Sequence, residues 1–367
     1  MRLALVIPTM AGGGAERVMS NLANAWVADA QQLTLITFES PGTQSFYQLE
    51  PGIRLVQLDL LEATTSIRNS LSANLKRIRT LRSMLKNLQP DLVVSFMTET
   101  NVVALLATLG LPAKVVVAEH TDPLIHDPGK LWRLLRNLTY RFASRVVVLN
   151  ERARAALAGS SGKRVIVIPN PVYVTKPAVD DPLPPCRGPY VLAMGRFSKE
   201  KRFDLVVNAF AQVVNRFPEW SLVLVGDGEK HSAIVKLVNR LGIQDRVFFT
   251  GYLRRPQYIL YHADIFISAS ILEGFPMAMT EAMASGVPGV ASRYHEGIDE
   301  IIRDSTQGLV VPIDDSIALT ESLTTLLQDK KLRNSIGAAG RIRMQVFSVE
   351  SVLTLWDEMF AELGVVD

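Results

Sequence analysis

The sequence predicts an α/β protein built from two doubly wound parallel sheets. Short β-branched runs alternate with helix-length segments along the whole chain, which is the pattern of parallel strands joined by crossover helices. The runs are continuously apolar rather than alternating, as expected for strands covered on both faces. A proline-dense stretch at 168–189 divides the 367 residues into two halves, and domains of about 150 residues suit this length.

The expected strands of the first half, residues 1–170, are each followed by a segment long enough for a crossover helix. They are Leu3–Ile7, Leu33–Phe38, Arg54–Leu58, Leu92–Phe96, Lys114–Ala118, Arg145–Leu149 and Arg164–Ile168. Residues 171–189 are rich in proline and lack periodicity, so we expect them to link the two halves.

The same pattern restarts at residue 190 and runs to residue 347, which predicts a second sheet of similar size. Its expected strands are Tyr190–Met194, Ser221–Val225, Val247–Thr250, Ile265–Ser268, Gly289–Ala291 and Gly308–Val311. The final segment, 348–367, carries Val352, Trp356 and Phe360 at helical spacing. We expect this amphipathic helix to pack back on the first half.

Composition excludes several classes of protein. Hydrophobic residues make up 48% of the chain and charged residues 20%, which excludes a disordered chain and a coiled coil. The single cysteine, Cys186, can form neither an internal disulfide nor a cysteine zinc cluster, and this favours the reducing cytoplasm. The longest apolar stretch, 102–111, is about half of a bilayer span, so no transmembrane helix is expected.

Charge is distributed unevenly along the chain. Residues 1–170 carry a net charge of +7 and residues 171–367 a net charge of −4, so one half is expected to face an anionic partner. Residues 63–90 contain no acid, and their apolar positions recur at three- and four-residue steps, which predicts an amphipathic helix. Arg79, Arg82 and Lys86 lie along or close to its apolar stripe.

These basic residues, together with a second basic and apolar segment at 130–145, leave three interpretations open. They are solvated helix faces, a surface for anionic lipid headgroups or a lipid-linked diphosphate, or a nucleic-acid surface. The third is disfavoured because the chain has neither zinc-finger spacing nor an aromatic RNA-binding pattern.

Two loops after expected strands are suited to binding an anion. Gly12-Gly13-Gly14 follows the first strand, where glycines let the backbone approach a ligand at a helix start. It matches neither a dinucleotide fingerprint nor a Walker A loop, so a simple tight turn is an alternative. Arg196 and Lys201 follow the first strand of the second half, where two cations can hold a diphosphate, although an ordinary charged helix start also fits.

A third loop carries two acidic residues. Glu273 precedes an expected helix, and Glu281 lies about two turns into that helix among alanines and methionines. A carboxylate in so apolar a helix is unfavourable unless it is paired or used in function. Both carboxylates can accept hydrogen bonds from sugar or ribose hydroxyls, and the N–H groups of Gly274 and Phe275 lie between them.

The order of these motifs resembles the retaining glycosyltransferases of family 4. The resemblance rests on Glu-x₇-Glu at 273–281, with Gly-Arg-Phe at 195–197 and Glu-Lys-Arg-Phe-Asp at 200–204 upstream. The opening Gly-Gly-Gly-Ala-Glu-Arg, Val-Gly-Asp-Gly at 225–228 and Ala-Ser-Gly-Val-Pro at 284–288 also match. The resemblance spans nearly the whole chain and implies the GT-B fold, in which two Rossmann-like domains face each other across a cleft.

The resemblance implies roles for the matching donor-site residues. Arg196 and Lys201 would grip the donor diphosphate, and Glu281 would bind the ribose. Glu273 would contact hydroxyls of the donor sugar, beside the two amides that follow it. Where many family members have a Gly-Gly or Ser-Gly run, this chain has Arg-Tyr-His-Glu-Gly at 293–297, which leaves the part played by that loop open.

The resemblance also implies roles in the first half. Gly13 and Gly14 would close on the phosphates and the acceptor, and His120 would lie near the transferred sugar. Taken alone, a histidine at a strand end is more often structural. No role is expected for the remaining histidines, His126, His231, His262 and His295.

The basic helix at 68–86 resembles family members that extend polyprenyl-diphosphate-linked oligosaccharides on the cytoplasmic face of the membrane. In those enzymes such a helix meets the lipid diphosphate, so the candidates here are Arg79, Arg82 and Lys86. The resemblance therefore implies a peripheral protein on the inner face of an anionic membrane. It implies a nucleotide-sugar donor and a lipid-linked glycan acceptor, and no nucleic acid.

The implied reaction is the retaining transfer of a hexose or N-acetylhexosamine to a glycan hydroxyl. A UDP-sugar is the favoured donor, and a GDP-sugar is the alternative donor. The chain has no Asp-x-Asp, so no metal or cofactor is expected, and Arg196, Lys201 and helix N-termini would meet the leaving-group charge. Four alternatives are a same-fold epimerase, a phosphorylase, a non-catalytic binding protein and an NAD-dependent dehydrogenase, which would lack its dinucleotide fingerprint.

Overall fold

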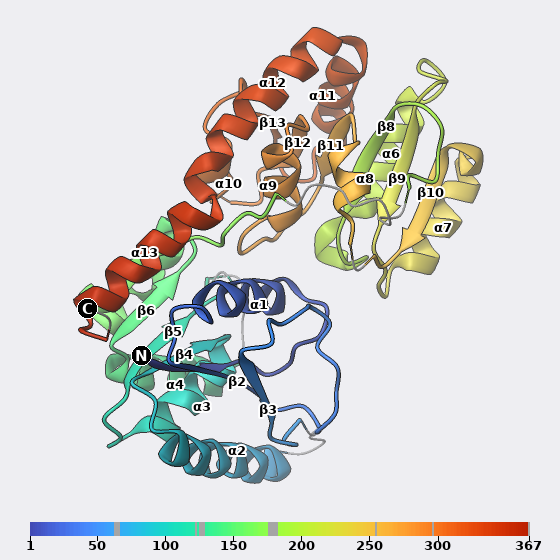
Figure 1. Ribbon diagram of the computed structural model, residues 1–367. Helices are drawn as coiled ribbons and strands as arrows, with labels where there is room; N and C mark the ends of the chain where they lie inside the picture. Colours follow the sequence, from blue (N-terminus) through green and yellow to red (C-terminus); the bar gives the residue numbers. More distant parts are fainter. Residues whose placement is uncertain are drawn as a thin grey trace. The chain divides into compact units, whose positions relative to one another are not determined.

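The computed structural model divides into two compact units, each described by itself (Figure 1). The first contains Met1–Asn170 and Val352–Asp367, and the second contains Pro171–Ser351. The structure describes residues 1–61, 67–121, 123–124, 129–174, 183–253, 255–295 and 297–365. Part of the expected linker, 175–182, therefore lies outside the described residues, as do His126 and Glu296.

The first unit contains a seven-stranded parallel sheet in the order β3-β2-β1-β4-β5-β6-β7. Its strands are β1 (Arg2–Val6), β2 (Gln32–Thr37), β3 (Ile53–Gln57), β4 (Leu92–Phe96), β5 (Lys114–Ala118), β6 (Arg145–Val148) and β7 (Val165–Val167). Every residue of β4 is buried, as its continuous apolar run predicts for a central strand covered on both faces. All seven expected strands of this half are present, and their ends differ from the expected ones by at most one residue.

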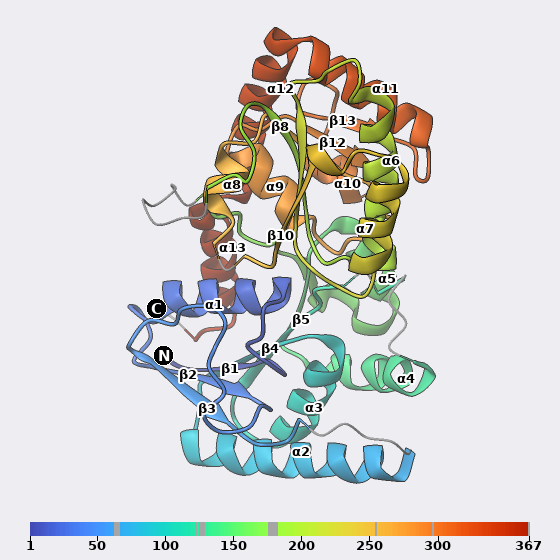
Figure 2. The same cartoon turned by 90° about the vertical axis from the view of Figure 1, so that its right-hand side faces the viewer.

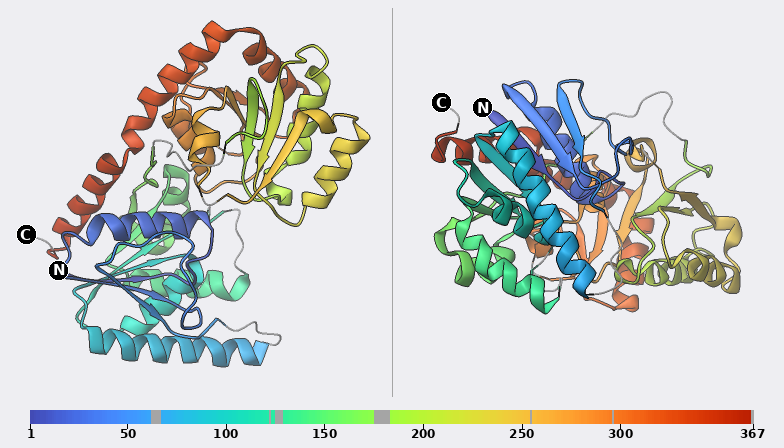
Figure 3. Two further views of the ribbon diagram at one scale, coloured as in Figure 1. Left: turned by 45° about the vertical axis from the view of Figure 1, so that its right-hand side comes forward. Right: turned by 90° about the horizontal axis from the view of Figure 1, so that it is seen from below.

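Helices cover both faces of this sheet. Figure 3 shows α1 (Gly14–Trp26) and α2 (Ile67–Leu88) on opposite faces, and in Figure 2 α3 (Thr98–Thr108) lies on the α2 side. α3 packs between α2 and α4 (Lys130–Thr139), and α5 (Glu151–Ser161) packs next to α4. The chain therefore reverses its winding direction between β1 and β4, which is the point where doubly wound sheets bind ligands.

The last helix, α13 (Val349–Glu362), contacts the first unit. The rings of Trp356 and Phe360 each lie 5.3 Å from the ring of Trp26 at the end of α1. Arg145 and Glu362 form an ion pair at 3.0 Å. An edge-on aromatic contact of this kind adds to the burial of its rings, so the apolar stripe of the helix accounts for its position.

The second unit contains a six-stranded parallel sheet in the order β10-β9-β8-β11-β12-β13. Its strands are β8 (Tyr190–Met194), β9 (Ser221–Val225), β10 (Val247–Gly251), β11 (Ile265–Ser268), β12 (Gly289–Ser292) and β13 (Leu309–Val311). The winding direction reverses between β8 and β11, so the loops after these two strands meet at one edge of the sheet.

Helices again form two layers. α6 (Phe203–Val213) packs on α7 (His231–Arg240) and α11 (Ser316–Gln328), whereas α9 (Met277–Ala284) packs on α8 (Gln257–Tyr261) and α12 (Lys330–Arg343). α10 (Gly297–Ile301) follows β12. The 3₁₀ helices of the described chain are η1 (Tyr140–Phe142), η2 (Gly162–Arg164), η3 (Lys199–Lys201), η4 (Gln244–Arg246) and η5 (Met344–Phe347).

Among the helices that the structure describes, none is both long and apolar enough to cross a membrane.

Candidate active site

Lys201 lies in the loop after β8, at the carboxyl edge of the second sheet. The chain leaves β8 through Gly195 and forms η3 before α6 begins. The N–H of Ile271 donates to the carbonyl oxygen of Glu200 at 2.8 Å, which ties this loop to the loop after β11. The Nζ atom of Lys201 lies 2.5 Å from Oε1 of Glu273. The structure therefore brings together two of the predicted site residues.

Two glycines allow the loop after β9 to support the loop that carries Lys201. A Cβ atom on Gly226 would lie 1.9 Å from the carbonyl oxygen of Gly195, and one on Gly228 would lie 2.6 Å from that of Phe197. Both glycines have positive φ angles, +129° and +157°, which side chains rarely adopt. The N–H of Phe197 donates to the carbonyl of Asp227 at 2.9 Å and closes the contact.

Glu273 is held at both its side chain and its main chain. Its carboxylate contacts Lys201, and the two side chains are 13% and 27% exposed, so the pair is partly shielded from solvent yet open to a ligand. Its carbonyl oxygen lies 2.8 Å from Nε2 of His295. No role was expected for His295, and the sequence offers no spacing signal that links it to a residue 22 positions earlier.

Glu281 lies in α9, the helix that follows Glu273 in the chain. Its side chain is 4% exposed and its neighbours in the helix, Met279, Ala282 and Met283, are buried. A buried carboxylate is unfavourable in such surroundings unless polar groups face it. Phe275 is itself buried and packs on Phe347 at 5.7 Å, so it can reach a ligand through its backbone N–H rather than its ring.

Arg196 is not joined to the pair of Lys201 and Glu273. Its side chain is 78% exposed and its Nε lies 3.6 Å from Oε2 of Glu229. Exposed ion pairs of this kind contribute little stability, so a stronger anion can displace Glu229 from Arg196.

In the first unit, Gly13 and Gly14 lie at the start of α1, the first helix after β1. Gly13 has an extended backbone and its carbonyl accepts the N–H of Arg17 at 3.1 Å, as a helix start requires. A Cβ atom on Gly13 would lie 2.2 Å from the carboxylate of Glu16. The Oε1 atom of Glu16 accepts a hydrogen bond from Thr9 at 3.1 Å, and burial raises the pKa of Glu16. No role was expected for Glu16 from the sequence.

His120 follows β5, and its ring lies on that of Phe96 with the centroids 4.0 Å apart. Both ring nitrogens are buried, and in the part of the chain that the structure describes neither has a hydrogen-bond partner. Burial lowers the pKa of His120 to about 3, so the imidazole is neutral at physiological pH. A neutral imidazole with two unused polar atoms can bond a ligand hydroxyl.

The neighbouring acid, Glu119, was not predicted as a site residue. It is buried and accepts hydrogen bonds from the hydroxyls of Thr98, at 2.8 Å, and Tyr140. Burial raises its pKa. These bonds anchor the residue immediately before His120. They therefore help to fix the position from which the imidazole extends.

The three predicted cations of α2 have different surroundings. Arg79 and Lys86 are exposed. Arg82 instead donates hydrogen bonds to the carbonyl oxygens of Ala107 at 2.8 Å and Leu109 at 2.7 Å. These carbonyls lie at the end of α3, where unsatisfied acceptors attract a cation. Arg82 therefore joins α2 to α3 in addition to any part it plays at the surface.

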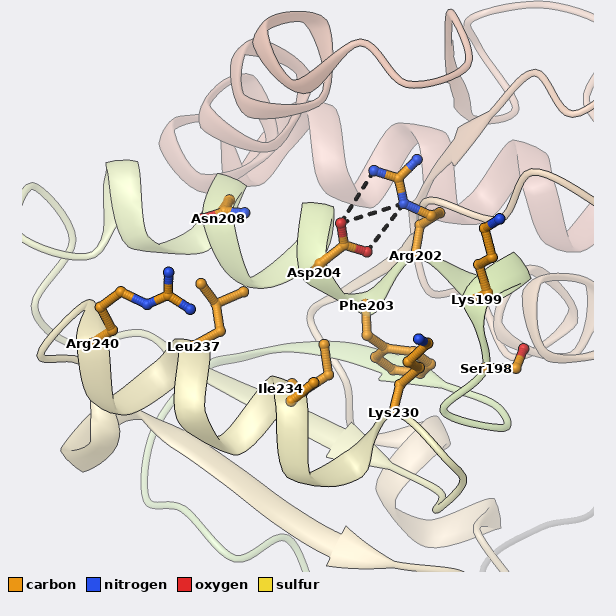
Figure 4. Close-up of a pocket in the computed structure, with 11 residues that line it drawn as sticks. Ser198, Lys199, Arg202, Phe203, Asp204, Asn208, Lys230, Ile234, Leu237 and Arg240 are labelled. Atoms are coloured by element: carbon orange, nitrogen blue, oxygen red, sulfur yellow. Dashed lines mark hydrogen bonds and ion pairs between the residues drawn. The ribbon is translucent and has the colours of Figure 1, made fainter.

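A groove of about 420 Å³ lies between α6 and α7 (Figure 4). Its basic residues include Lys199, Lys230 and Arg240, and Arg202 in the same groove is paired with Asp204 at 3.1 Å. None of the predicted site residues lines it.

Two family descriptions match the chain in succession. "Glycosyl transferase 4-like domain" matches residues 13–171, and "Glycosyl transferases group 1" matches residues 180–343. The chain is a family 4-like glycosyltransferase of the GT-B fold. The expected family and the two Rossmann-like halves are thus confirmed, and a dehydrogenase is disfavoured.

Relatives agree with this family, and solved structures share the fold. An α-1,4-N-acetyl-D-galactosaminyltransferase from Campylobacter jejuni is 28% identical over 99% of both chains, and its name specifies a glycan on undecaprenyl diphosphate as acceptor. Sucrose-phosphate synthase from Thermosynechococcus elongatus superposes with a TM-score of 0.84 at 21% identity over 100% of both chains. HepE from Anabaena in complex with UDP gives 0.77 at 21% identity over 99% and 100%. These two structures show the shared fold.

Proposed function

We propose that this glycosyltransferase moves an N-acetylhexosamine or hexose, with retention, from a nucleotide sugar to a hydroxyl of a polyprenyl-diphosphate-linked glycan. A UDP-sugar is the favoured donor. The donor half of the proposal rests on the contact between Lys201 and Glu273. The buried Glu281 lies in α9, the helix that follows Glu273. Two Campylobacter jejuni relatives, whose names specify undecaprenyl-diphosphate acceptors, support the acceptor half.

Lys201 would hold the donor diphosphate. In the structure one carboxylate, that of Glu273, compensates the ammonium. A diphosphate carries more charge and more acceptor oxygens than a carboxylate, so it can recruit the same ammonium without a large movement. Arg196 would leave its weak exposed pair with Glu229 and join Lys201 on the diphosphate.

The two acids would bind the sugar and ribose hydroxyls. Glu273 lies beside Lys201, so a diphosphate held there brings the attached sugar next to its carboxylate. Glu281, which is buried in α9, would accept hydrogen bonds from the ribose hydroxyls. The N–H groups of Gly274 and Phe275 would face the donor between these two acids.

In the proposed reaction, the bond between the anomeric carbon and the donor phosphate oxygen breaks. The acceptor hydroxyl oxygen bonds to the same face of that carbon, and its proton passes to an oxygen of the departing phosphate. Lys201, Arg196 and helix N–H groups stabilise the charge of the leaving nucleoside diphosphate, so the proposal requires no metal. Neutral His120 would bond a hydroxyl of the transferred sugar, and Gly13 and Gly14 would admit the phosphates and acceptor.

The acceptor and the membrane would meet the basic face of the first unit. Arg79 and Lys86 of α2 are exposed and can contact a lipid diphosphate. α4 and the turn after it expose an apolar row, Leu131, Leu134, Leu138 and Phe142, with basic residues between them and no acid from 129 to 150. This composition is typical of a helix at an anionic lipid interface, and it supports peripheral association with the cytoplasmic face.

The test of the donor site is loss of transfer in two variants. Glu273→Gln and Lys201→Ala should each lower kcat/KM by about a hundredfold or more, because each removes a group that acts on the transition state. The assay follows N-acetylgalactosamine transfer from UDP-N-acetylgalactosamine to a polyprenyl-diphosphate-linked disaccharide. Glu321→Gln and Lys236→Ala, at exposed positions of the same unit, are matched controls. Wild-type turnover by both site variants would overturn the assignment.

A further inference from the structure

His295 lies in the loop between β12 and α10, the loop in which this chain departs from the family pattern. Its side chain is 7% exposed, and both ring nitrogens are engaged. Nδ1 accepts the N–H of Gly297 at 2.9 Å, and Nε2 lies 2.8 Å from the carbonyl oxygen of Glu273. Because Nδ1 accepts, these partners assign the proton to Nε2, which therefore donates to Glu273.

This hydrogen bond fixes more than one atom. The carbonyl of Glu273 and the N–H of Gly274 belong to one trans, planar peptide unit and point in opposite directions across it. Once His295 holds the carbonyl on one side, the direction of the Gly274 N–H on the other side is set as well. The same bond restrains the Cα of Glu273, from which the carboxylate reaches Lys201.

The side chain of His295 is held in place by the residues packed around it. The ring of Tyr294 stands at 89° to that of His295 with the centroids 4.5 Å apart. Tyr294 is buried, and burial together with the nearby carboxylates of Glu273, Glu300 and Asp299 raises the pKa of its hydroxyl. The loop after β12 is thus packed against the loop that carries Glu273, and Lys201 anchors Glu273 on its side-chain end.

We propose that His295 is a positioning residue for donor transfer: its Nε2–H holds the Glu273 carbonyl and thereby aims the Gly274 N–H and the Glu273 carboxylate at the donor sugar. The inference rests on the proposed donor role of Glu273. It assigns to the 293–297 loop a function that the family pattern does not provide, because a glycine run at that place has no side chain to make this bond.

Two substitutions separate the two bonds of the imidazole. The amide of His295→Gln reaches the place of Nε2 and keeps a donor for the Glu273 carbonyl, while it gives up the acceptor for Gly297. The shorter amide of His295→Asn lies at the place of Nδ1, so it keeps the Gly297 bond and loses the Glu273 bond. kcat and KM for UDP-N-acetylgalactosamine and the thermal midpoint are measured for both, with His262→Asn at an exposed histidine as control.

We expect His295→Asn to lower kcat/KM for the donor between about tenfold and a hundredfold, as misplacement of a binding group does, and His295→Gln to stay within about threefold of wild type. Equal losses in both variants, losses only in His295→Gln, or unchanged kinetics in both would each overturn the inference. If His295→Asn does not fold, His295→Gln still tests the inference. A loss of kcat/KM in His295→Gln as large as that in Glu273→Gln would contradict the role of Nε2. Full activity of Glu273→Gln would instead refute the donor site itself.

Discussion

At the scale of single residues, the proposed donor site depends on how Glu273 is held. Lys201 contacts its carboxylate at 2.5 Å and His295 contacts its carbonyl at 2.8 Å, so the residue is fixed before any substrate arrives. Preorganised groups of this kind need little rearrangement during the reaction. Arg196, in contrast, faces solvent beside Glu229 and has to move to take part.

His120 leads to a prediction about pH. Burial lowers its pKa from 6.5 to about 3, so below pH 6.5 the unfolded chain binds a proton that the folded chain does not. Stability is therefore lost as the pH falls from 6.5 towards 3, by up to about 1.4 kcal/mol per pH unit. Between pH 7 and pH 5, urea unfolding should show that wild type loses up to about 2 kcal/mol more than His120→Phe. The exposed His262→Phe is the control, and parallel pH curves for wild type and His120→Phe would refute the prediction.

Site residues that belong to sequence motifs could be predicted. Residues whose contacts join segments far apart in the chain could not. Lys201 and Glu273 are 72 positions apart, yet each follows a strand at the same sheet edge, and the family resemblance implied that both bind the donor. His295 contacts a main-chain carbonyl, and Glu119 contacts the hydroxyls of Thr98 at the start of α3 and Tyr140 at the start of η1. Such contacts depend on loop conformation, which apolar periodicity does not encode.

At the scale of elements, α2 has one face packed on the fold and one face exposed to solvent. Its buried Leu81 and Leu85 face the sheet, while Arg82 bonds the carbonyls at the end of α3. Arg79 and Lys86 are exposed on this helix, and in our proposal they contact a lipid diphosphate. Periodicity predicted this helix and its flanking cations, but it could not show that Arg82 has acceptors on a neighbouring helix.

This division predicts different outcomes for substitutions within α2. The double variant Arg79→Glu with Lys86→Glu should raise KM for a lipid-linked acceptor about tenfold or more and leave UDP affinity unchanged, because it reverses charge only at the surface. Arg82→Ala should lower the free energy of unfolding by about 1–3 kcal/mol, since two carbonyls lose their donor.

Steady-state kinetics and urea unfolding check the two parts. The control is the double variant Arg54→Glu with Lys114→Glu. It makes the same change of charge at two other exposed positions of the first unit. If this control pair raises acceptor KM as much as the α2 pair does, α2 has no special role. An Arg82→Ala protein as stable as wild type would show that its bonds to α3 are unimportant.

At the scale of the whole molecule, two sheets repeat one arrangement. In each, the winding direction reverses beside the first strand of the unit, β1 or β8, and predicted site residues follow those strands. The number of strands and their positions along the chain could be predicted because buried parallel strands have continuous apolar runs. The helix α13 could be predicted from its stripe, but its contact with Trp26 is a matter of aromatic packing that spacing alone does not specify.

The central claim is that the carboxyl edge of the second sheet binds a nucleoside diphosphate through Lys201 without a metal. Thermal unfolding with UDP, GDP, ADP or NAD in EDTA, for wild type and Lys201→Ala, tests it most directly. A ligand at about a hundred times its Kd stabilises the folded state by about 2.7 kcal/mol, a rise of roughly 2–4 °C. We predict this rise for UDP in wild type and its loss in Lys201→Ala. A rise with NAD alone, a rise abolished by EDTA, or an equal rise with UDP in both proteins would contradict the account.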